Sequence, residues 1–388
     1  MHLLLSEELI EVKNLSRQIA EEKIKPVREE LDEKKEFPYE IMKHIAKSDL
    51  FRVFIPEEYD GMGLGIAGMS IATEEFSRVC AGVALGYAGT GLGTMPIILF
   101  GSEEQKKKYL PQIASGEKLA AFGLTEANAG SDASNIQTMA KKDGDYYYLT
   151  GTKQFITNGE VAGIYTVIAN TDPSKGIRGL SAFIVEKGTE GFAFGKHENK
   201  MGIRASATSE LVFDNCRVHK SDMLAAEGQG FKVAMKTLEY SRLGVGAQAL
   251  GIAQGAFEEA VKYANERVQF NQKIFSFQMI QSMIADMAIQ IEAGRSLAYI
   301  GMIYVDKGGA DVAKIGSMIK TFCSDMAMKV TTDAVQVLGG YGYIKEYPVE
   351  KMMRDAKITQ IYEGTNQIQR VVLAQEILKK GCEIKDMY

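Results

Sequence analysis

Hydrophobic and polar residues alternate in three different ways along the chain. From residue 1 to about 117, apolar residues recur every three or four positions between charged ones, which predicts amphipathic helices. From about 118 to 225, short runs of aromatic and β-branched residues separated by turn-forming residues predict strands. From about 226 to 388 the helical spacing returns. The pattern therefore predicts a helical domain over 1–117, a β domain over 118–225 and a second helical domain over 226–388.

Individual elements can be placed within these zones. Ser102, followed three residues later by Gln105, predicts a capped helix start. An earlier helix is predicted from the spacing of Leu9, Val12, Leu15 and Ile19. Strands are predicted at 145–157, with a glycine turn inside it, at 165–169 and at 181–185. A long helix in the core of a bundle is predicted from the spacing of Met279, Met283 and Met287.

These elements define a fold class. Short strands separated by turns suggest a small antiparallel barrel or sandwich, and long apolar stripes in the last zone suggest a bundle of helices. The predicted class is α+β, with an N-terminal helical domain, a central antiparallel β-barrel domain and a C-terminal four-helix bundle.

Composition narrows the classes of function. The net charge of -5 argues against a nucleic-acid or anionic-membrane partner, which would require a basic face. The apolar run at the start of the chain is too short for a signal peptide. No stretch of 18 or more apolar residues appears, so no membrane-spanning helix is expected. The four cysteines form no CxxC pair, so no disulfide framework and no metal site is expected. A cytoplasmic location is the simplest interpretation.

Known nucleotide-binding motifs are missing from the sequence. Gly61, Gly63 and Gly65 have neither the spacing nor the strand-to-helix context of a Rossmann fingerprint, and no phosphate-binding P-loop occurs. Three other segments are dense in small and polar residues: 122–132, 336–343 and 361–367. Small residues let backbone N–H groups approach a ligand. Composition alone also allows a tight capped loop, helix C-caps and a surface turn, respectively.

Taken together, these segments resemble the acyl-CoA dehydrogenase family over nearly the whole chain. The run from Thr125-Glu126 to Gly130-Ser131-Asp132 resembles the first signature of the family. Residues 151–158, Gly-Thr-Lys-Gln-Phe-Ile-Thr-Asn, resemble its flavin loop in the β domain. Residues 336–342, 354–357 and 362–365 resemble its C-terminal signature. Short-chain, butyryl-CoA-type bacterial members are the most similar, and the resemblance implies the acyl-CoA dehydrogenase fold.

The resemblance implies an FAD site between the β domain and the C-terminal helices. Residues implied to bind the flavin are Phe122, Leu124, Thr125, Ser131, Phe155 and Thr157. Residues implied to complete the dinucleotide site are Arg267, Phe270, Gln278, Gln336, Gly340, Thr365 and Gln367. Arg267 is expected to contact the pyrophosphate of a neighbouring subunit, because its fork of donors matches phosphate oxygens. Because such a site is shared between subunits, the resemblance implies a homotetramer. The alternative interpretation of Arg267 is a solvated residue on a helix.

The family removes the α and β hydrogens of an acyl-CoA to form the 2-enoyl-CoA. Glu363 would be the base that takes the α proton, with the β hydrogen leaving as hydride to the flavin. The Glu363 backbone N–H and a flavin ribose hydroxyl would stabilise the developing enolate. Electrons would pass to electron-transferring flavoprotein. Residues implied to contact the substrate are Ser131, Glu239, Tyr240, Arg242, Thr90 and Gly364. For Glu239 and Arg242, a buried helix ion pair is the alternative.

Two departures bear on the acyl group. Tyr240-Ser241 stands where butyryl-CoA-type members have two glycines, and Ala127 stands where many members have proline. The glycine-rich run 89–94, which includes Thr90, falls where the acyl end is usually shaped and suggests room for a broader or cyclic acyl group. Three other functions stay open. They are an enoyl-CoA reductase that works with electron-transferring flavoprotein, an acyl-CoA oxidase, and a non-enzymatic flavin- or acyl-CoA-binding protein.

Overall fold

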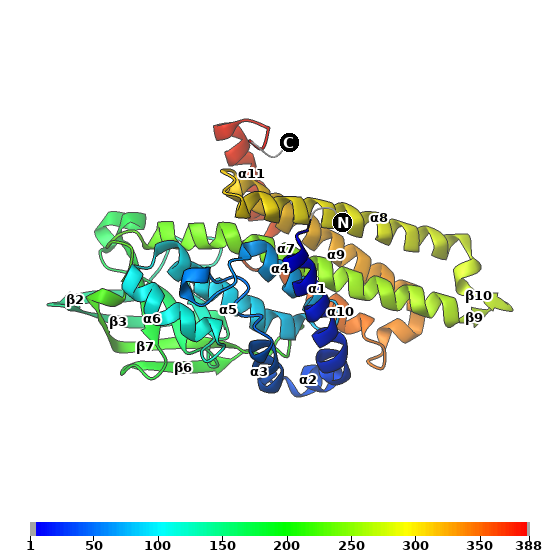
Figure 1. Ribbon diagram of the computed structural model, residues 1–388, viewed down its shortest axis with the longest axis horizontal. Helices are drawn as coiled ribbons and strands as arrows, with labels where there is room; N and C mark the ends of the chain where they lie inside the picture. The colour runs from blue at the N-terminus through cyan, green and yellow to red at the C-terminus, as the bar shows by residue number, and fades with distance from the viewer. Residues whose placement is uncertain (1–4, 386–388) are drawn as a thin grey trace.

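The computed structural model describes residues 5–385 (Figure 1). Residues 1–4, which belong to the apolar start judged too short for a signal peptide, lie outside the described residues. Helices of the first domain are α1 (Glu7–Ile19), α2 (Arg28–Lys34), α3 (Tyr39–Lys47), α4 (Gly65–Ser77), α5 (Ala81–Phe100) and α6 (Glu103–Ala114).

The predicted capped start of α6 is confirmed, and the predicted apolar face of α1 is confirmed in part. The Ser102 side chain accepts from the Gln105 N–H, and the Gln105 side chain accepts from the Ser102 N–H, so α6 begins with a complete capping box. On α1, Leu9, Val12 and Ile19 are buried, whereas Leu15 is exposed. The apolar face of α1 is therefore narrower than predicted.

Helix α5 differs from the expectation that no segment is long and apolar enough to cross a membrane. Its twenty residues carry no charge, and length and composition alone would allow a span. Most of the helix is buried inside the protein, against α4, α7 and β1. Burial in the core accounts for its apolar character.

The central domain contains one sheet of eight strands. Its strands are β1 (Ala120–Gly123), β2 (Met139–Asp143), β3 (Tyr146–Thr157), β4 (Ile164–Asn170), β5 (Leu180–Glu186), β6 (Phe192–His197), β7 (Thr208–His219) and β8 (Met223–Leu224). The order is β6-β7-β3-β2-β4-β5-β8, with β1 paired to β4. Neighbours are mostly antiparallel, but β4 is parallel to both β1 and β2.

Two predictions about this sheet are wrong. The hydrogen-bonded path ends at β6 and β8, so within residues 5–385 the sheet does not close into a barrel. The predicted glycine turn inside 145–157 is absent as well, because β3 continues through Gly151. The register shifts between Leu149 and Gly151, and a Cβ on Gly151 would lie 2.6 Å from the Thr138 hydroxyl. Gly151 thus permits a β-bulge rather than a turn.

The C-terminal domain is built on three long helices. They are α7 (Gly230–Glu266), α8 (Gln278–Asp306) and α9 (Val312–Leu338), followed by the shorter α10 (Val349–Thr359) and α11 (Asn366–Lys380). A hairpin of β9 (Val268–Gln269) and β10 (Gln272–Lys273) joins α7 to α8. In Figure 1, α7 runs from the sheet domain to this hairpin. The predicted long helix is α8, in which Met287 is buried but Met279 is 77% exposed, so Met279 is not a core residue.

A clamp of charged residues fixes α10 to the sheet domain. Asp355 accepts from the backbone N–H of Ile203 at 2.5 Å and from Lys351 at 2.5 Å. Arg354 donates to the carbonyl of Met201 and to Asp32 of α2. All three domains therefore meet at the helix that leads into the segment 360–366.

Candidate active site

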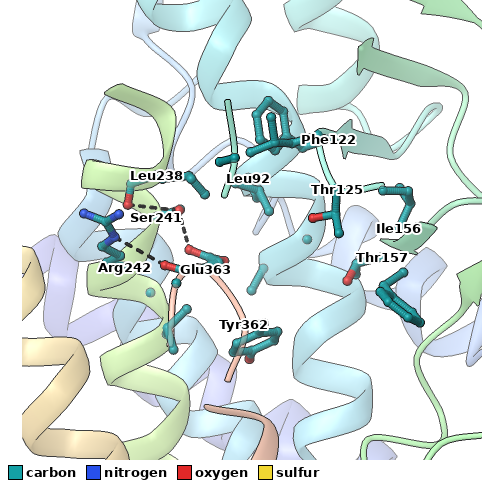
Figure 2. A pocket seen from close by; sticks show the side chains of 18 of the residues that line it. Leu92, Phe122, Thr125, Ile156, Thr157, Leu238, Ser241, Arg242, Tyr362 and Glu363 are labelled. Atoms are coloured by element: carbon teal, nitrogen blue, oxygen red, sulfur yellow. Dashed lines mark hydrogen bonds between the residues drawn. The ribbon is translucent and has the colours of Figure 1, made fainter. Parts of the chain in front are cut away.

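A pocket lies between the sheet domain and helices α4, α5 and α7 (Figure 2). One wall comes from the ends of β1 and β3 and is formed by Phe122, Leu124, Thr125, Phe155, Ile156 and Thr157. The opposite wall comes from the helices and is mostly apolar: Met69, Leu85, Ala88, Leu92, Leu238 and Val245. Glu363 and Arg242 are the ionisable carboxylate and guanidinium groups on this lining.

The backbone at Glu363 is in an unusual conformation. Glu363 has φ +54° and Gly364 has φ +91°, and Thr365 then caps α11 by accepting from the Ile368 N–H. A non-glycine residue with positive φ persists only when its surroundings hold it. Arg242 Nε donates to the Glu363 carbonyl at 3.3 Å, and Gln369 Nε2 donates to it at 3.1 Å. These two bonds fix the segment that presents the Glu363 side chain to the pocket.

The Glu363 side chain is half-buried and lines the pocket. Desolvation raises the pKa of this carboxyl above its ordinary value, while the Ser241 hydrogen bond and the charges of Arg242 and Lys320 act in the opposite direction. Within residues 5–385, no Lys, Arg or His forms an ion pair with this carboxylate. The result is a carboxylate that is a stronger base than an exposed one.

Lys320 supports the same segment from α9, although no motif pointed to it. Its ammonium donates to the Gly364 carbonyl at 2.8 Å and to Asn366 Oδ1 at 2.6 Å. Burial lowers the pKa of Lys320 to about 8, although the nearby Glu363 charge opposes this shift. The sequence singled out Ser241 only as a replacement for glycine, because its partner Glu363 lies 122 residues away. Gln369 was missed because an isolated Gln carries no motif, although it donates to the carbonyls of Glu363 and Gly364.

The wall opposite Glu363 is ordered by a buried ion pair. Glu126 accepts from Lys153 at 2.6 Å and from the backbone N–H groups of Gln137 and Thr138. Lys153 also donates to the Leu124 carbonyl at 3.1 Å. These contacts tie the loop after β1 to β3. They explain why the first signature and the flavin-loop signature lie side by side.

Nine residues predicted for the site line this one pocket. They are Phe122, Leu124, Thr125, Ser131, Phe155, Thr157, Arg242, Glu363 and Gly364. Arg267 and Gly340 line a second pocket with Tyr263 and Tyr341, near the hairpin. Thr365 and Gln367 line another, with Arg370 and Asp325. Phe270, at the hairpin, is 88% exposed, and Gln278 and Gln336 are exposed on α8 and α9.

Three predicted substrate contacts lie elsewhere. Thr90 is fully buried, with its hydroxyl bonded to the Gly86 carbonyl at 3.1 Å and to Asn158, so it does not face the pocket. Glu239 pairs with Lys236 at 2.7 Å rather than with Arg242. Tyr240 packs against the hydrophobic core. None of the three lines the pocket, whereas their neighbour Ser241 does.

Gly89 lines the pocket, whereas Gly91 and Gly93 of the same run do not leave empty space. A Cβ on Gly91 would lie 2.1 Å from the Met69 sulfur, and a Cβ on Gly93 would lie 2.4 Å from the Ala121 nitrogen. They allow α5 to pack closely against α4 and β1. Met69 fills the gap between Gly91 of α5 and Gly244 of α7. The expectation that glycine here makes room for a broad acyl group is therefore not supported by the packing.

The fold places a pocket between three domains, and the desolvated carboxylate of Glu363 lines it. Residues 6–117, 121–216 and 228–378 match the N-terminal, middle and C-terminal domains of acyl-CoA dehydrogenase. The chain belongs to the acyl-CoA dehydrogenase family and is an acyl-CoA dehydrogenase-type oxidoreductase.

Three similar proteins have informative descriptions. Butyryl-CoA dehydrogenase from Megasphaera elsdenii is 45% identical, with a TM-score of 0.94 over 96% of this chain and 99% of that chain. A structure described as the electron transferring flavoprotein of Acidaminococcus fermentans contains a chain that is 48% identical, with a TM-score of 0.95 over 97% and 99%. Acryloyl-CoA reductase (NADH) from Anaerotignum propionicum is 46% identical over 371 residues, 95% of this chain and 94% of that protein.

Proposed function

We propose that this protein binds FAD and oxidises a short-chain acyl-CoA to the 2-enoyl-CoA, with electron-transferring flavoprotein as the acceptor. The observation that carries the proposal is the position of Glu363. Its desolvated carboxylate faces a pocket whose opposite wall is the flavin-loop signature (Figure 2). A proton acceptor and a cofactor surface on two sides of one apolar pocket suit removal of two hydrogens from adjacent carbons.

The wall opposite Glu363 fits a planar cofactor. Phe155 has φ +59° and leaves 60% of its surface exposed, which is unusual for an aromatic residue with a strained backbone. A stacking group would cover this ring. Thr125 and Thr157 offer hydroxyls beside it, and a Cβ on Gly130 would meet nothing within 4 Å. When bound, the flavin supplies the acceptor for the β hydrogen as hydride.

The chain itself supplies the proton chemistry. Glu363 takes the α proton of the acyl-CoA, and desolvation makes its carboxylate basic enough for a weakly acidic C–H. In the part of the chain that the structure describes, the Glu363 backbone N–H donates to no protein acceptor. This free donor would bind the thioester carbonyl oxygen, where negative charge develops as the proton leaves.

Arg267 and Gly340 line a different pocket from the one that contains Phe155 and Glu363. Arg242 of α7 and Arg267, the C-cap of that helix, are 25 residues apart, which is about 38 Å along an α-helix. Arg267 and Gly340 would therefore hold the FAD of a neighbouring subunit. Exposed apolar residues support an assembly, in keeping with a homotetramer: Met279, Ile289 and Leu378 are 77%, 66% and 86% exposed.

The test of the proposed function is anaerobic titration of the flavin-loaded protein with butyryl-CoA. We expect the yellow flavin band to bleach in the wild type. The Glu363→Gln variant should keep its bound flavin. Its flavin should bleach at least about 100-fold more slowly, because a positioned general base contributes at least that factor to the rate. Near-normal bleaching by the variant would show that Glu363 is not the base.

A second function uses the same site in reverse. The similarity to an acryloyl-CoA reductase and to a chain from a structure described in terms of electron bifurcation favours an enoyl-CoA reductase that works in complex with electron-transferring flavoprotein. Reduction of crotonyl-CoA by NADH that depends on added flavoprotein would support this direction. Bleaching by butyryl-CoA with no such reduction would support the oxidative one.

A further inference from the structure

Ser241 occupies a position that the proposed chemistry leaves unexplained. It lies on α7, is only 5% exposed and lines the pocket beside Glu363. Its hydroxyl has two acceptors in reach: the Leu238 carbonyl at 3.4 Å and, considerably closer, Glu363 Oε2. A helical serine ordinarily donates to a carbonyl in the preceding turn. A hydroxyl has one proton, so the shorter contact indicates that Ser241 donates it to the carboxylate (Figure 2).

The polar side chains around Glu363, apart from Ser241, donate to acceptors other than its carboxylate. From α7, Arg242 Nε donates to the Glu363 backbone carbonyl at 3.3 Å. From α9, Lys320 donates to the Gly364 carbonyl and to Asn366. The Tyr362 hydroxyl contacts Gln248. Within residues 5–385, Ser241 is therefore the only side chain that forms a hydrogen bond with the Glu363 carboxylate.

This arrangement separates the two oxygens of the carboxylate. Oε2 accepts from Ser241, and Oε1 accepts from no donor in the described part of the chain. A hydroxyl that donates favours the ionised carboxylate over the neutral acid, because the charged form is the stronger acceptor. The same bond limits rotation of the carboxyl group. Oε1 is then left to receive a proton from the pocket.

We propose that Ser241 is a positioning residue that holds the Glu363 carboxylate ionised and directs its free oxygen to the substrate. The inference rests on the proposed role of Glu363 as the base. Ser241 keeps its own proton throughout, while the α proton passes from the substrate carbon to Glu363 Oε1. Burial alone would keep Glu363 protonated over a wider range of pH, and Ser241 counteracts this tendency without adding a charge to the pocket.

A first experiment follows the Glu363 carboxyl group directly and does not depend on turnover. Infrared difference titration of the flavin-loaded protein detects the protonated carboxyl band, which is assigned by its loss in Glu363→Gln. We expect Ser241→Ala to raise the midpoint of this band by about one to two pH units, the size expected for loss of a hydrogen bond to a charged group. An unchanged midpoint would overturn the proposal.

Matched variants separate positioning from a general effect on the fold. Thr237→Val removes another buried hydroxyl from the preceding turn of α7, outside the pocket, and should leave the midpoint unchanged. Ser241→Thr retains the hydroxyl and should restore the wild-type midpoint. Ser241→Gly serves as a second deletion that cannot crowd the pocket. An equal shift in Thr237→Val, or loss of bound flavin in both deletions, would assign Ser241 to the fold and overturn the proposal.

The pH profile of kcat/KM for butyryl-CoA supplies the second readout. Its acid limb should move upward in Ser241→Ala by the same amount as the infrared midpoint, and kcat at high pH should fall because the carboxylate is no longer held in position. If the wild type itself shows no reaction with acyl-CoA, the proposed function fails, while the infrared result still decides the role of Ser241. A kcat that is low at all pH values, with unmoved limbs, would contradict the proposal.

Discussion

Lys320 shows at the scale of one residue how the support of the segment around Glu363 depends on pH. The side chain is fully buried, and burial lowers the pKa of its ammonium to about 8. An unfolded lysine has a pKa of about 10.4, so the folded state binds this proton less tightly than the unfolded state does. The free energy cost of the buried charge is complete below pH 8. It is relieved as the pH rises from about 8 to about 10.4.

We therefore expect Lys320 to make the protein more resistant to unfolding as the pH rises within that window. The contribution is on the order of 3 kcal/mol in total. The Lys320→Met variant should lack this slope, even though its stability at neutral pH also changes because Gly364 and Asn366 lose a donor. Urea unfolding at intervals between pH 7 and pH 10 measures the slope. Parallel curves for the two proteins would contradict the lowered pKa.

Among single residues, sequence resemblance predicted Glu363 and its neighbours but not the residues that support them. Glu363 lies within a contiguous signature that can be read along the chain. Ser241 lies 122 residues away from it and acts through one contact in space. Thr90 failed in the opposite way, since its helix was rightly placed near the pocket but its side chain turns towards Gly86 and Asn158. The direction of a side chain depends on packing that no local pattern records.

Met69 shows how packing between elements shapes the pocket. It is 2% exposed and lies between Gly91 of α5 and Gly244 of α7, and a Cβ at these two positions would lie 2.1 Å and 3.2 Å from it. Since methionine fills irregular gaps, this single flexible side chain forms part of the pocket lining where the three helices meet. Met69→Ala should destabilise the protein by about 2–5 kcal/mol and leave a cavity continuous with the pocket.

The added space should favour longer substrates. We expect the ratio of kcat/KM for hexanoyl-CoA over butyryl-CoA to rise in Met69→Ala. Met95→Ala is the matched control, because Met95 is also buried on a helix of this domain but does not line the pocket. It should lose stability without a change in that ratio. An equal change of this ratio in both variants would mean that Met69 does not limit the length of the acyl chain that the pocket accepts.

At the scale of elements, the sequence predicted correctly those helix starts and strands that depend on interactions between neighbouring residues. The capping box at Ser102 and the strands β4 and β5 follow from neighbouring residues and were placed correctly. Closure of the sheet depends on whether β6 and β8 meet, and no segment of sequence encodes that by itself. Met279 has the same spacing as Met287, yet one is exposed and the other buried. Periodicity identifies which residues share a face of a helix, but it does not show which part of that face another element covers.

At the scale of the whole molecule, the predicted cofactor contacts are distributed over three separate pockets, and Arg267 lies in a different pocket from Glu363. If the FAD beside Glu363 is held by Arg267 of a neighbour, two inactive variants can complement each other. Co-assembly of Glu363→Gln with Arg267→Glu should restore up to about a quarter of the wild-type activity, the statistical share of sites with both residues intact. Each variant alone should be inactive or nearly so. Activity in the mixture that equals the sum of the separate variants would place both residues in one chain's site.

The left-handed backbone at Glu363 has a consequence for evolution. A long side chain at positive φ is strained, and glycine or asparagine would relieve that strain. Selection for heat resistance and selection for turnover therefore act on residue 363 in opposite directions. Variants chosen for stability alone would drift towards glycine there and, under the proposed function, would lose the base together with the carboxylate.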